Sequence, residues 1–183
     1  MAKELILILG GARSGKSSHA ERLASEMGGS AVLYVATAQA FDDEMRARIA
    51  AHRTSRPRGW RTLEAPSLLD VPVAEAAGSA RVVLLDCMTL LASNAILALG
   101  DEPAASAAEA AIDREVSALL GVYHTCDAAW IVVSNEVGLG LVPPYPLGRV
   151  YRDGLGRANQ RLAAAADRVL LMVAGIPFTL KHP

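Results

Sequence analysis

Cysteine is scarce in this sequence: there are two, Cys87 and Cys126, among 183 residues. They lie far apart with no paired spacing, so the sequence predicts neither a disulfide framework nor a zinc site. Cys87 follows a buried-strand pattern, and both cysteines are interpreted as small core residues.

The sequence also lacks a long hydrophobic run and a strong net charge. No apolar stretch approaches the roughly 20 residues that span a bilayer. The run Leu5–Leu9 leads into a glycine-rich stretch instead of a cleavable signal. The net charge of −1 gives no bias toward nucleic acid or anionic membranes. We therefore expect a soluble, cytoplasmic protein without a membrane span or a nucleic-acid partner.

A phosphate-binding motif is the clearest feature of the sequence. Gly10-Gly11-Ala12-Arg13-Ser14-Gly15-Lys16-Ser17 fits G-x-x-x-x-G-K-[ST], between a short apolar run and a helical pattern. In such a loop the backbone N–H groups surround phosphate, Lys16 reaches the β- and γ-phosphates and the Ser17 hydroxyl binds Mg²⁺. The alternative is a strand–turn–helix whose glycines only turn the chain.

Apolar runs alternate with helical patterns along the whole chain. Unbroken Val, Leu and Ile runs predict strands that are buried on both faces, at Leu5–Leu9, Ala31–Ala36, Val82–Asp86, Ala129–Ser134 and Arg168–Ala174. Helical spacing predicts helices at Ser17–Met27, Asp42–Arg53, Ser67–Ala77, Ala104–Tyr123 and Tyr151–Ala166. This order predicts an α/β fold, a mostly parallel sheet flanked by helices in a single domain over residues 1–183. The tail Phe178–Lys181 predicts an edge hairpin with the last strand.

An acidic residue, Asp86, ends the third of these strands. A carboxylate there holds Mg²⁺ in phosphate-loop enzymes, and the alternative is a cap on the next helix. Similarly, Ser134–Gly140 predicts either a ligand-approaching loop or a turn with an asparagine cap.

One histidine, His52, lies in a helix rich in arginine. Arg48 and His52 are four residues apart and share a face, and Arg56 extends it if the helix continues. A surface helix with a solvated basic face explains this pattern. A phosphate site containing a nucleophilic imidazole, kept neutral by neighbouring guanidinium groups, also explains it.

Taken together, these segments resemble one family, the bifunctional adenosylcobinamide kinase / adenosylcobinamide-phosphate guanylyltransferases of cobalamin biosynthesis. The resemblance covers nearly the whole chain. It rests on Gly10–Ser17, Tyr34–Ala38, Asp42–Met45, Arg48-Ile49, His52-Arg53, Ser134–Pro143, Arg152-Asp153, Gly156-Arg157 and Asn159-Gln160.

The resemblance implies two reactions. ATP or GTP first phosphorylates the aminopropanol hydroxyl of adenosylcobinamide. GTP then transfers GMP to a histidine, which matches His52, and the phosphorylated cobinamide takes the GMP to give adenosylcobinamide-GDP. The family also implies a RecA-like phosphate-loop fold and a homotrimer.

The resemblance implies the site residues as well. Catalysis falls to His52 and Lys16, and Mg²⁺ to Ser17 and Asp86. The implied nucleotide-binding residues are Gly10, Gly11, Ala12, Arg13, Ser14, Gly15, Lys16, Ser17, Ala36, Thr37, Ala38, Arg53, Thr54, Ser55, Arg56, Glu64 and Asp86. The sequence departs from the family at Pro144–Arg149, where many members have a polar segment, and some members have Glu at position 86.

Two other functions fit the same motif. A small-molecule kinase uses the loop without a covalent step, which leaves His52 as a phosphate-contacting or solvated residue. A nucleotide-switched assembly module uses hydrolysis to control a protein partner.

Overall fold

The computed structural model describes residues 3–40, 43–67 and 70–182. Within these ranges, only the backbone is described for residues 44, 45, 48, 51, 52, 55, 70 and 71. Its described strands form one sheet in the order β3-β2-β4-β5-β1-β6-β7. They are β1 (Leu5–Gly10), β2 (Val32–Ala36), β3 (Arg61–Glu64), β4 (Val82–Asp86), β5 (Ala129–Val133), β6 (Arg168–Val173) and β7 (Ile176–Lys181). Neighbours are parallel except β7, which runs antiparallel to β6. This confirms the predicted α/β fold.

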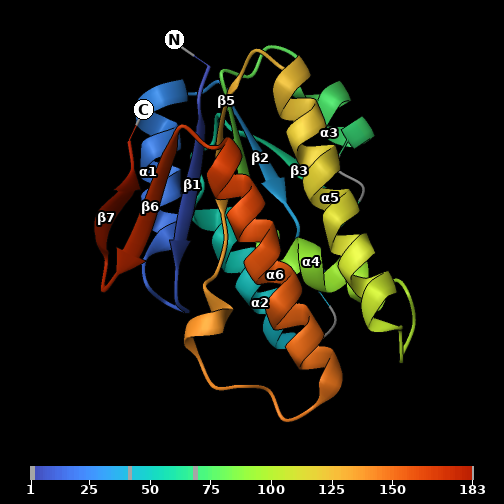
Figure 1. The fold of residues 1–183 in the computed structure, drawn as a ribbon. Helices are drawn as coiled ribbons and strands as arrows, with labels where there is room; N and C mark the ends of the chain where they lie inside the picture. The colour runs from blue at the N-terminus through green and yellow to red at the C-terminus, as the bar shows by residue number, and fades with distance from the viewer. Residues whose placement is uncertain (1–2, 41–42, 68–69, 183) are drawn as a thin grey trace.

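Helices cover both faces of this sheet (Figure 1). They are α1 (Lys16–Gly28), α2 (Asp43–Ser55), α3 (Asp70–Ala77), α4 (Met88–Leu97), α5 (Ala105–Thr125) and α6 (Pro146–Ala165), with a short 3-10 turn, η1 (Val137–Leu139). Helix α1 packs on one face of the sheet, and α3, α4, α5 and α6 pack on the other.

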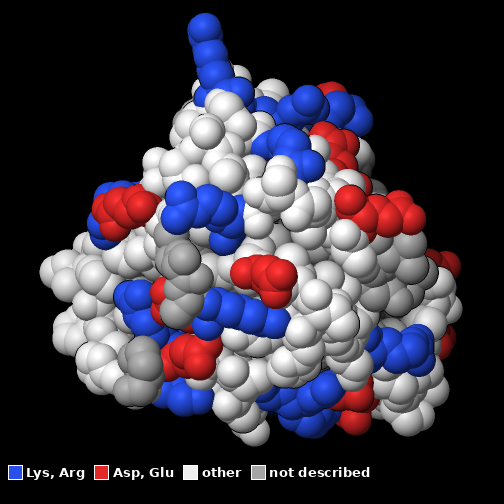
Figure 2. Space-filling view, turned by 90° about the horizontal axis from the view of Figure 1, so that it is seen from above, with Lys and Arg blue, Asp and Glu red and all other residues white. Residues whose placement is uncertain are grey.

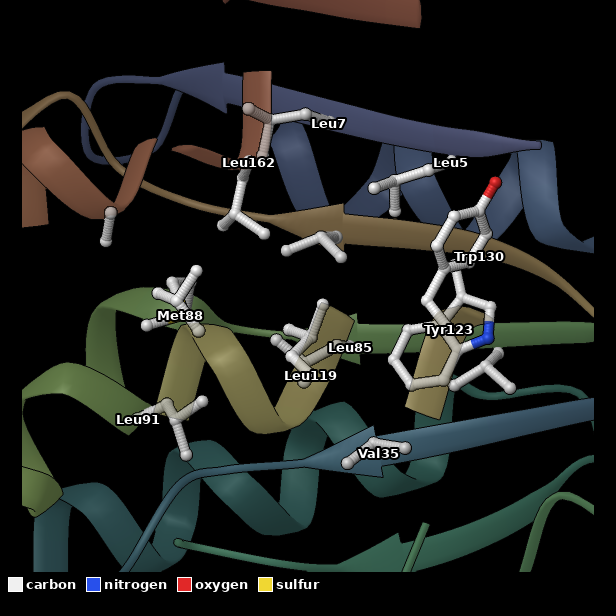
Figure 3. Close-up of a cluster of buried hydrophobic side chains, with 14 of the residues drawn as sticks. Leu5, Leu7, Val35, Leu85, Met88, Leu91, Leu119, Tyr123, Trp130 and Leu162 are labelled. Atoms are coloured by element: carbon white, nitrogen blue, oxygen red, sulfur yellow. The ribbon is translucent and has the colours of Figure 1, made fainter. Parts of the chain in front are cut away.

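Two hydrophobic cores hold these layers together. Successive strand side chains point to opposite faces, so Leu7 and Leu85 belong to the larger core, while Ile8 and Leu84 belong to the core beneath α1. Figure 3 shows the larger core, where side chains of α4, α5 and α6 meet those of the central strands. The unbroken apolar runs therefore reflect strands that are buried on both faces.

The structure contains elements that the sequence patterns did not predict. Strand β3 is short, mostly exposed and polar in sequence, so it lacks the apolar run on which the other predictions rest. Helix α4 is buried along most of its length, including its polar residues Thr89 and Asn94, so it lacks the amphipathic period of a surface helix. Helix α6 begins at Pro146, before the predicted Tyr151, because proline is well suited to the first turn. The predicted hairpin is confirmed as β6 and β7.

The surface at the amino ends of the strands carries both signs of charge. Figure 2 views the molecule from above Figure 1, and basic and acidic side chains alternate over this face. The pair Arg168 and Glu4, 3.6 Å apart, lies at the amino ends of β6 and β1. Among the described residues, no helix combines the length and apolar character needed to cross a bilayer.

We expect Leu84→Ala to destabilise the fold strongly. Leu84 is fully buried in the centre of β4, so its truncation leaves a cavity that costs about 2–5 kcal/mol. Urea titration followed by circular dichroism measures this loss. Leu141→Ala is the matched control, because Leu141 is 96% exposed and its truncation leaves the unfolding midpoint nearly unchanged. Equal effects of the two substitutions would contradict the core assignment.

Candidate functional site

A cleft of about 1130 Å³ opens at the carboxyl ends of the parallel strands. Ligands of open α/β sheets bind at this edge, because the loops that leave the strands converge there. Predicted site residues that line the cleft are Ala12, Arg13, Ser14, Gly15, Lys16, Ser17, Ala36, Ala38, Arg53, Arg56, Glu64 and Asp86. The fold thus brings together residues from the phosphate loop, from β2, β3 and β4, and from the end of α2.

The phosphate loop has the backbone conformation that its glycines allow. Gly10, Arg13 and Gly15 all have positive φ, of 151°, 55° and 92°. Gly15 caps α1, so the N-terminus of that helix and its free N–H groups face the loop. Such an arrangement is a ready anion site, and its shape and charge suit a phosphate group.

Lys16 supplies a buried cation to the loop. It is 8% exposed, and its ammonium donates to the Gly11 carbonyl at 2.6 Å. Burial lowers the pKa of Lys16, and the nearby Cys87 and Asp86 oppose this change. The ammonium therefore lies between the loop and the acidic end of β4, where a phosphate can exchange for the carbonyl as its partner.

Two neighbouring segments hold the phosphate loop in place: the turn between β6 and β7 and the loop after β5. The Gly175 N–H donates to the Ser14 carbonyl at 3.0 Å, and the Glu136 N–H donates to the Gly10 carbonyl at 3.1 Å. The buried Ser14 hydroxyl has no hydrogen-bond partner among the described residues. Because an unpaired buried hydroxyl is costly, a ligand in the loop can satisfy it.

Asp86 ends β4 on the floor of the cleft, and Tyr34 of β2 donates a hydrogen bond to its Oδ2 at 2.9 Å. Helix α4 is capped at Cys87 without a side-chain bond, so the structure does not support the alternative that Asp86 is the cap. Cys87 packs against the core beneath α1, as its interpretation as a core residue predicts, and it also borders the cleft. Burial and the Asp86 charge raise the pKa of its thiol to about 11, which keeps the thiol neutral.

The end of α2 forms another wall of the cleft. Arg53 and Arg56 line it together with Glu64 of β3, and Arg53 pairs with Glu64 at 3.3 Å. Both groups of this pair are mostly exposed, so it adds little stability. Position 52 belongs to α2. The side chains of His52 and Ser55 lie outside the described part of the structure.

Two further predicted residues stand apart from the cleft lining. Thr37 is fully buried, and its hydroxyl donates to the Cys87 carbonyl and accepts from the Cys87 N–H, both at 2.8 Å. It thereby ties the ends of β2 and β4 together. The Thr54 hydroxyl donates to the Ala50 carbonyl within α2. Neither residue is part of the cleft surface, and nor are Gly10 and Gly11.

The loop after β5 is fixed by a buried network from α6. Ser134 donates to Asn159 Oδ1 at 2.7 Å, and the Asn159 amide donates to the Asn135 carbonyl and to Glu136 Oε1. The Asn135 N–H donates to the Thr89 hydroxyl at 2.9 Å. These hydrogen bonds fix the start of the segment, and Asn135 lines the cleft. The short turn η1 is capped at Glu136 without a side-chain bond, so Asn135 is not its cap. That the loop contacts a ligand stays a prediction.

Several cleft residues are not among the site residues that the sequence predicts: Ser18, Tyr34, Gln39, Ala40, Ile49, Pro66, Cys87, Thr89, Leu90 and Val133. The signal was weak for most of them. Tyr34 sits inside an apolar strand pattern, and Thr89 follows Asp86 in a segment that lacks helical periodicity. Asn135 also lines the cleft, and it belongs to the predicted loop Ser134–Gly140, which follows a buried strand at the same edge as Asp86.

Comparison with known families and proteins agrees with this geometry. The family model described as cobinamide kinase / cobinamide phosphate guanyltransferase matches residues 6–180. The bifunctional adenosylcobalamin biosynthesis protein CobU of Salmonella typhimurium is 46% identical over 97% of this chain and 99% of its own. The bifunctional adenosylcobalamin biosynthesis protein CobP of Pseudomonas aeruginosa is 48% identical over 96% of both chains.

Solved structures of lower identity share the fold. The flagellar accessory protein FlaH of Methanocaldococcus jannaschii gives a TM-score of 0.50 at 15% identity, covering 98% of this chain and 78% of that one. A second solved structure, an ATPase domain, superposes with a TM-score of 0.53 at 13% identity, covering 92% of this chain and 69% of that one. At these identities the likeness concerns the fold alone.

We expect Gly10→Ala and Gly11→Ala to separate the two glycines that open the loop. A Cβ at Gly10 meets the Met172 carbonyl oxygen at 2.6 Å, whereas a Cβ at Gly11 meets nothing within 4 Å. Gly10→Ala therefore loses about 1–3 kcal/mol of stability through backbone strain. It also weakens binding of a fluorescent GTP analogue, since the loop must shift.

Thermal unfolding and a fluorescence titration measure both effects. Gly11→Ala should unfold at the wild-type temperature. A Gly10→Ala protein as stable and as tightly binding as wild type would show that the loop does not require this backbone.

Proposed function

Because this chain belongs to the cobinamide kinase / cobinamide phosphate guanyltransferase family, we propose that it passes GMP to its corrinoid substrate through a covalent bond to His52. The chain is a bifunctional transferase of cobalamin biosynthesis, with a kinase and a guanylyltransferase activity. We propose that residues 1–183 act as one catalytic domain for both reactions. One observation carries the proposal: the phosphate loop and the end of the His52 helix line the same cleft.

In the kinase reaction, the loop holds the phosphates of ATP or GTP. The backbone N–H groups of Gly10–Ser17 and the Lys16 ammonium bind the β- and γ-phosphates. The aminopropanol hydroxyl of adenosylcobinamide attacks the γ-phosphorus, and the bond to the β-phosphate oxygen breaks. The proton of that hydroxyl leaves with solvent or phosphate. The protein contributes mainly by positioning the reactants and by stabilising charge.

The oxygen donors at the cleft fit a magnesium ion. No cluster of three or more His, Cys, Asp or Glu side chains suited to a metal occurs in the described ranges. Mg²⁺ needs no such cluster, because it takes one or two protein oxygens and completes its coordination with phosphates and water. We propose that the Ser17 hydroxyl and the Asp86 carboxylate hold it. When bound, the ion neutralises charge that develops on the phosphates.

In the guanylyl transfer, a neutral His52 imidazole is the nucleophile. Its nitrogen attacks the α-phosphorus of GTP, the bond to the β-phosphate oxygen breaks and pyrophosphate leaves. A phosphate oxygen of the phosphorylated cobinamide then attacks the same phosphorus, and the P–N bond breaks. Arg53 and Arg56 supply guanidinium groups to the nucleotide phosphates in this part of the cleft.

We expect labelled GTP to mark the protein from its α-phosphate only. Wild-type protein is incubated with [α-³²P]GTP or [γ-³²P]GTP and Mg²⁺, denatured and tested for acid-labile, base-stable label. His52→Ala should take up no label from either nucleotide, whereas it should retain most of the cobinamide kinase rate. Far-UV circular dichroism shows whether the variant is folded.

The other outcomes of this experiment separate the rival functions. A folded His52→Ala protein that is still labelled would rule out His52 as the nucleophile. Unlabelled wild-type protein with a rapid kinase rate would indicate a kinase without a covalent step. Nucleotide hydrolysis that does not respond to adenosylcobinamide would instead indicate a nucleotide-switched assembly module.

We also propose a cytoplasmic homotrimer that binds corrinoid and nucleotide but no nucleic acid. Both cysteines are free thiols, which fits a reducing compartment. Ile176, Phe178 and Leu180 of β7 are 56–60% exposed on one side of an edge strand, an apolar surface suited to contact with another chain.

We expect light scattering coupled to size exclusion to give a mass three times the 19.2 kDa of one chain. The measurement is made over a tenfold concentration range, because a weak assembly dissociates on dilution. A monomeric mass at every concentration would contradict the trimer. The labelling result stands independently of this outcome.

A further inference from the structure

Tyr34 connects two walls of the cleft, one through its hydroxyl and the other through its aromatic ring. It lies in β2, is 2% exposed and lines the cleft. Its hydroxyl reaches Asp86, and its ring lies beneath the guanidinium group of Arg56, whose central carbon is 3.5 Å from the ring centroid. Trp60 stacks nearby, with ring centroids 6.5 Å apart and an interplanar angle of 28°.

The hydroxyl end orients a carboxylate. It donates to Asp86 Oδ2 at 2.9 Å. A phenol loses its proton only near pH 10 (about 10 in model peptides), so at neutral pH the Tyr34 hydroxyl is a hydrogen-bond donor. This bond occupies one carboxylate oxygen and limits rotation of the group, which fixes the direction in which the other oxygen faces a cation.

The aromatic ring of Tyr34 contacts Arg56, in the segment that follows α2. The helix ends at Ser55, so Arg56 is the next residue. The Arg56 guanidinium group lies over the Tyr34 ring, and its Nη1 donates to the Thr62 hydroxyl at 3.3 Å. The contact is partly withdrawn from water, where attraction between a cation and an aromatic ring is strongest. It therefore anchors the end of α2 about one turn from position 52.

We propose that Tyr34 is a positioning residue with two separable roles: its hydroxyl sets the metal-binding carboxylate and its ring sets the helix of the guanylyl transfer. This inference rests on the proposed function for the identity of both partners. Strand β2 is parallel to β4, with Ala36 opposite Asp86, so the hydroxyl of Tyr34 lies within reach of the carboxylate. One buried side chain thereby relates the parts of the cleft that serve two reactions.

Two substitutions separate these roles. Tyr34→Phe keeps the ring and removes the hydroxyl, whereas Tyr34→Met keeps apolar volume and removes both. Electron paramagnetic resonance measures Mn²⁺ binding in the presence of a non-hydrolysable GTP analogue, and [α-³²P]GTP measures the rate of labelling at saturating Mg²⁺.

We expect Tyr34→Phe to raise the Mn²⁺ dissociation constant about fivefold or more, while labelling at saturating Mg²⁺ stays within about twofold of wild type. Tyr34→Met should weaken Mn²⁺ binding equally and should also slow labelling at least tenfold, because added metal cannot restore the position of α2.

Tyr123→Phe is the matched control. Tyr123 is also a buried tyrosine whose hydroxyl donates to an aspartate, Asp167, but at the amino ends of the strands. It should leave both readouts unchanged. A shift in Tyr123→Phe equal to that in Tyr34→Phe would show a general loss of stability and would overturn the proposal.

A double-mutant cycle that combines Tyr34→Met with Arg56→Gln tests the role of the ring separately. If the Tyr34 ring acts through Arg56, the double variant takes up label from [α-³²P]GTP no more slowly than Arg56→Gln alone. Additive losses of labelling rate would overturn the proposed role of the ring. A Mn²⁺ affinity of Tyr34→Phe equal to that of wild type would overturn the proposed role of the hydroxyl.

If Tyr34→Met does not fold, Tyr34→Leu takes its place in the cycle. Wild-type protein that takes up no GMP would contradict the proposed function, and the Mn²⁺ measurement would still decide whether the Tyr34 hydroxyl matters.

Discussion

The burial of parallel strands on both faces is the constraint on which the site depends. Side chains of β1, β2, β4 and β5 alternate between the two cores, so a slip of one residue in register would exchange the entire set between them. The register is thereby fixed, and parallel strands that are fixed in register end at one edge. The loop after β1, the acid at the end of β4 and the polar loop after β5 converge there because the cores leave no other arrangement.

Side-chain hydrogen bonds at that edge fix the positions of the loops that converge there. The hydroxyl of Thr37, directly after β2, makes hydrogen bonds to both the carbonyl and the N–H of Cys87. Asn94 of α4 donates to the Thr37 and Pro66 carbonyls. Asn159 fixes the loop after β5 from α6. Each of these side chains is buried and satisfied, so each holds its loop rigidly. The phosphate loop rests on this frame through Gly175 and Glu136.

The sequence predicted those parts of the fold whose pattern is local. Gly10–Ser17 has a fixed spacing within one segment, and Asp86 directly follows a buried run, so both were assigned before any packing was known. Strand β3 escaped prediction because it pairs at an edge with little apolar content. Tyr34 escaped because its role depends on Asp86, 52 residues away, and on Arg56, beyond a helix. These residues meet only through the pairing of strands and the packing of α2, which no local sequence pattern predicts.

The order of the strands supports the proposal that one cleft serves chemistry at two phosphorus atoms. Strands β3 and β2 lie at one end of the sheet and β1 lies toward the other, with β4 and β5 between them. The arginines and Glu64 thus face the cleft from the side of β2 and β3, and the phosphate loop faces it from the side of β1. Asp86 lies on β4, between these groups. In the proposed function, a triphosphate extends from the loop toward the arginines and passes close to this carboxylate, whose orientation then bears on both ends of the same ligand. The neutral phenol of Tyr34 orients that carboxylate and leaves its negative charge available to a cation, whereas a cationic donor would neutralise that charge.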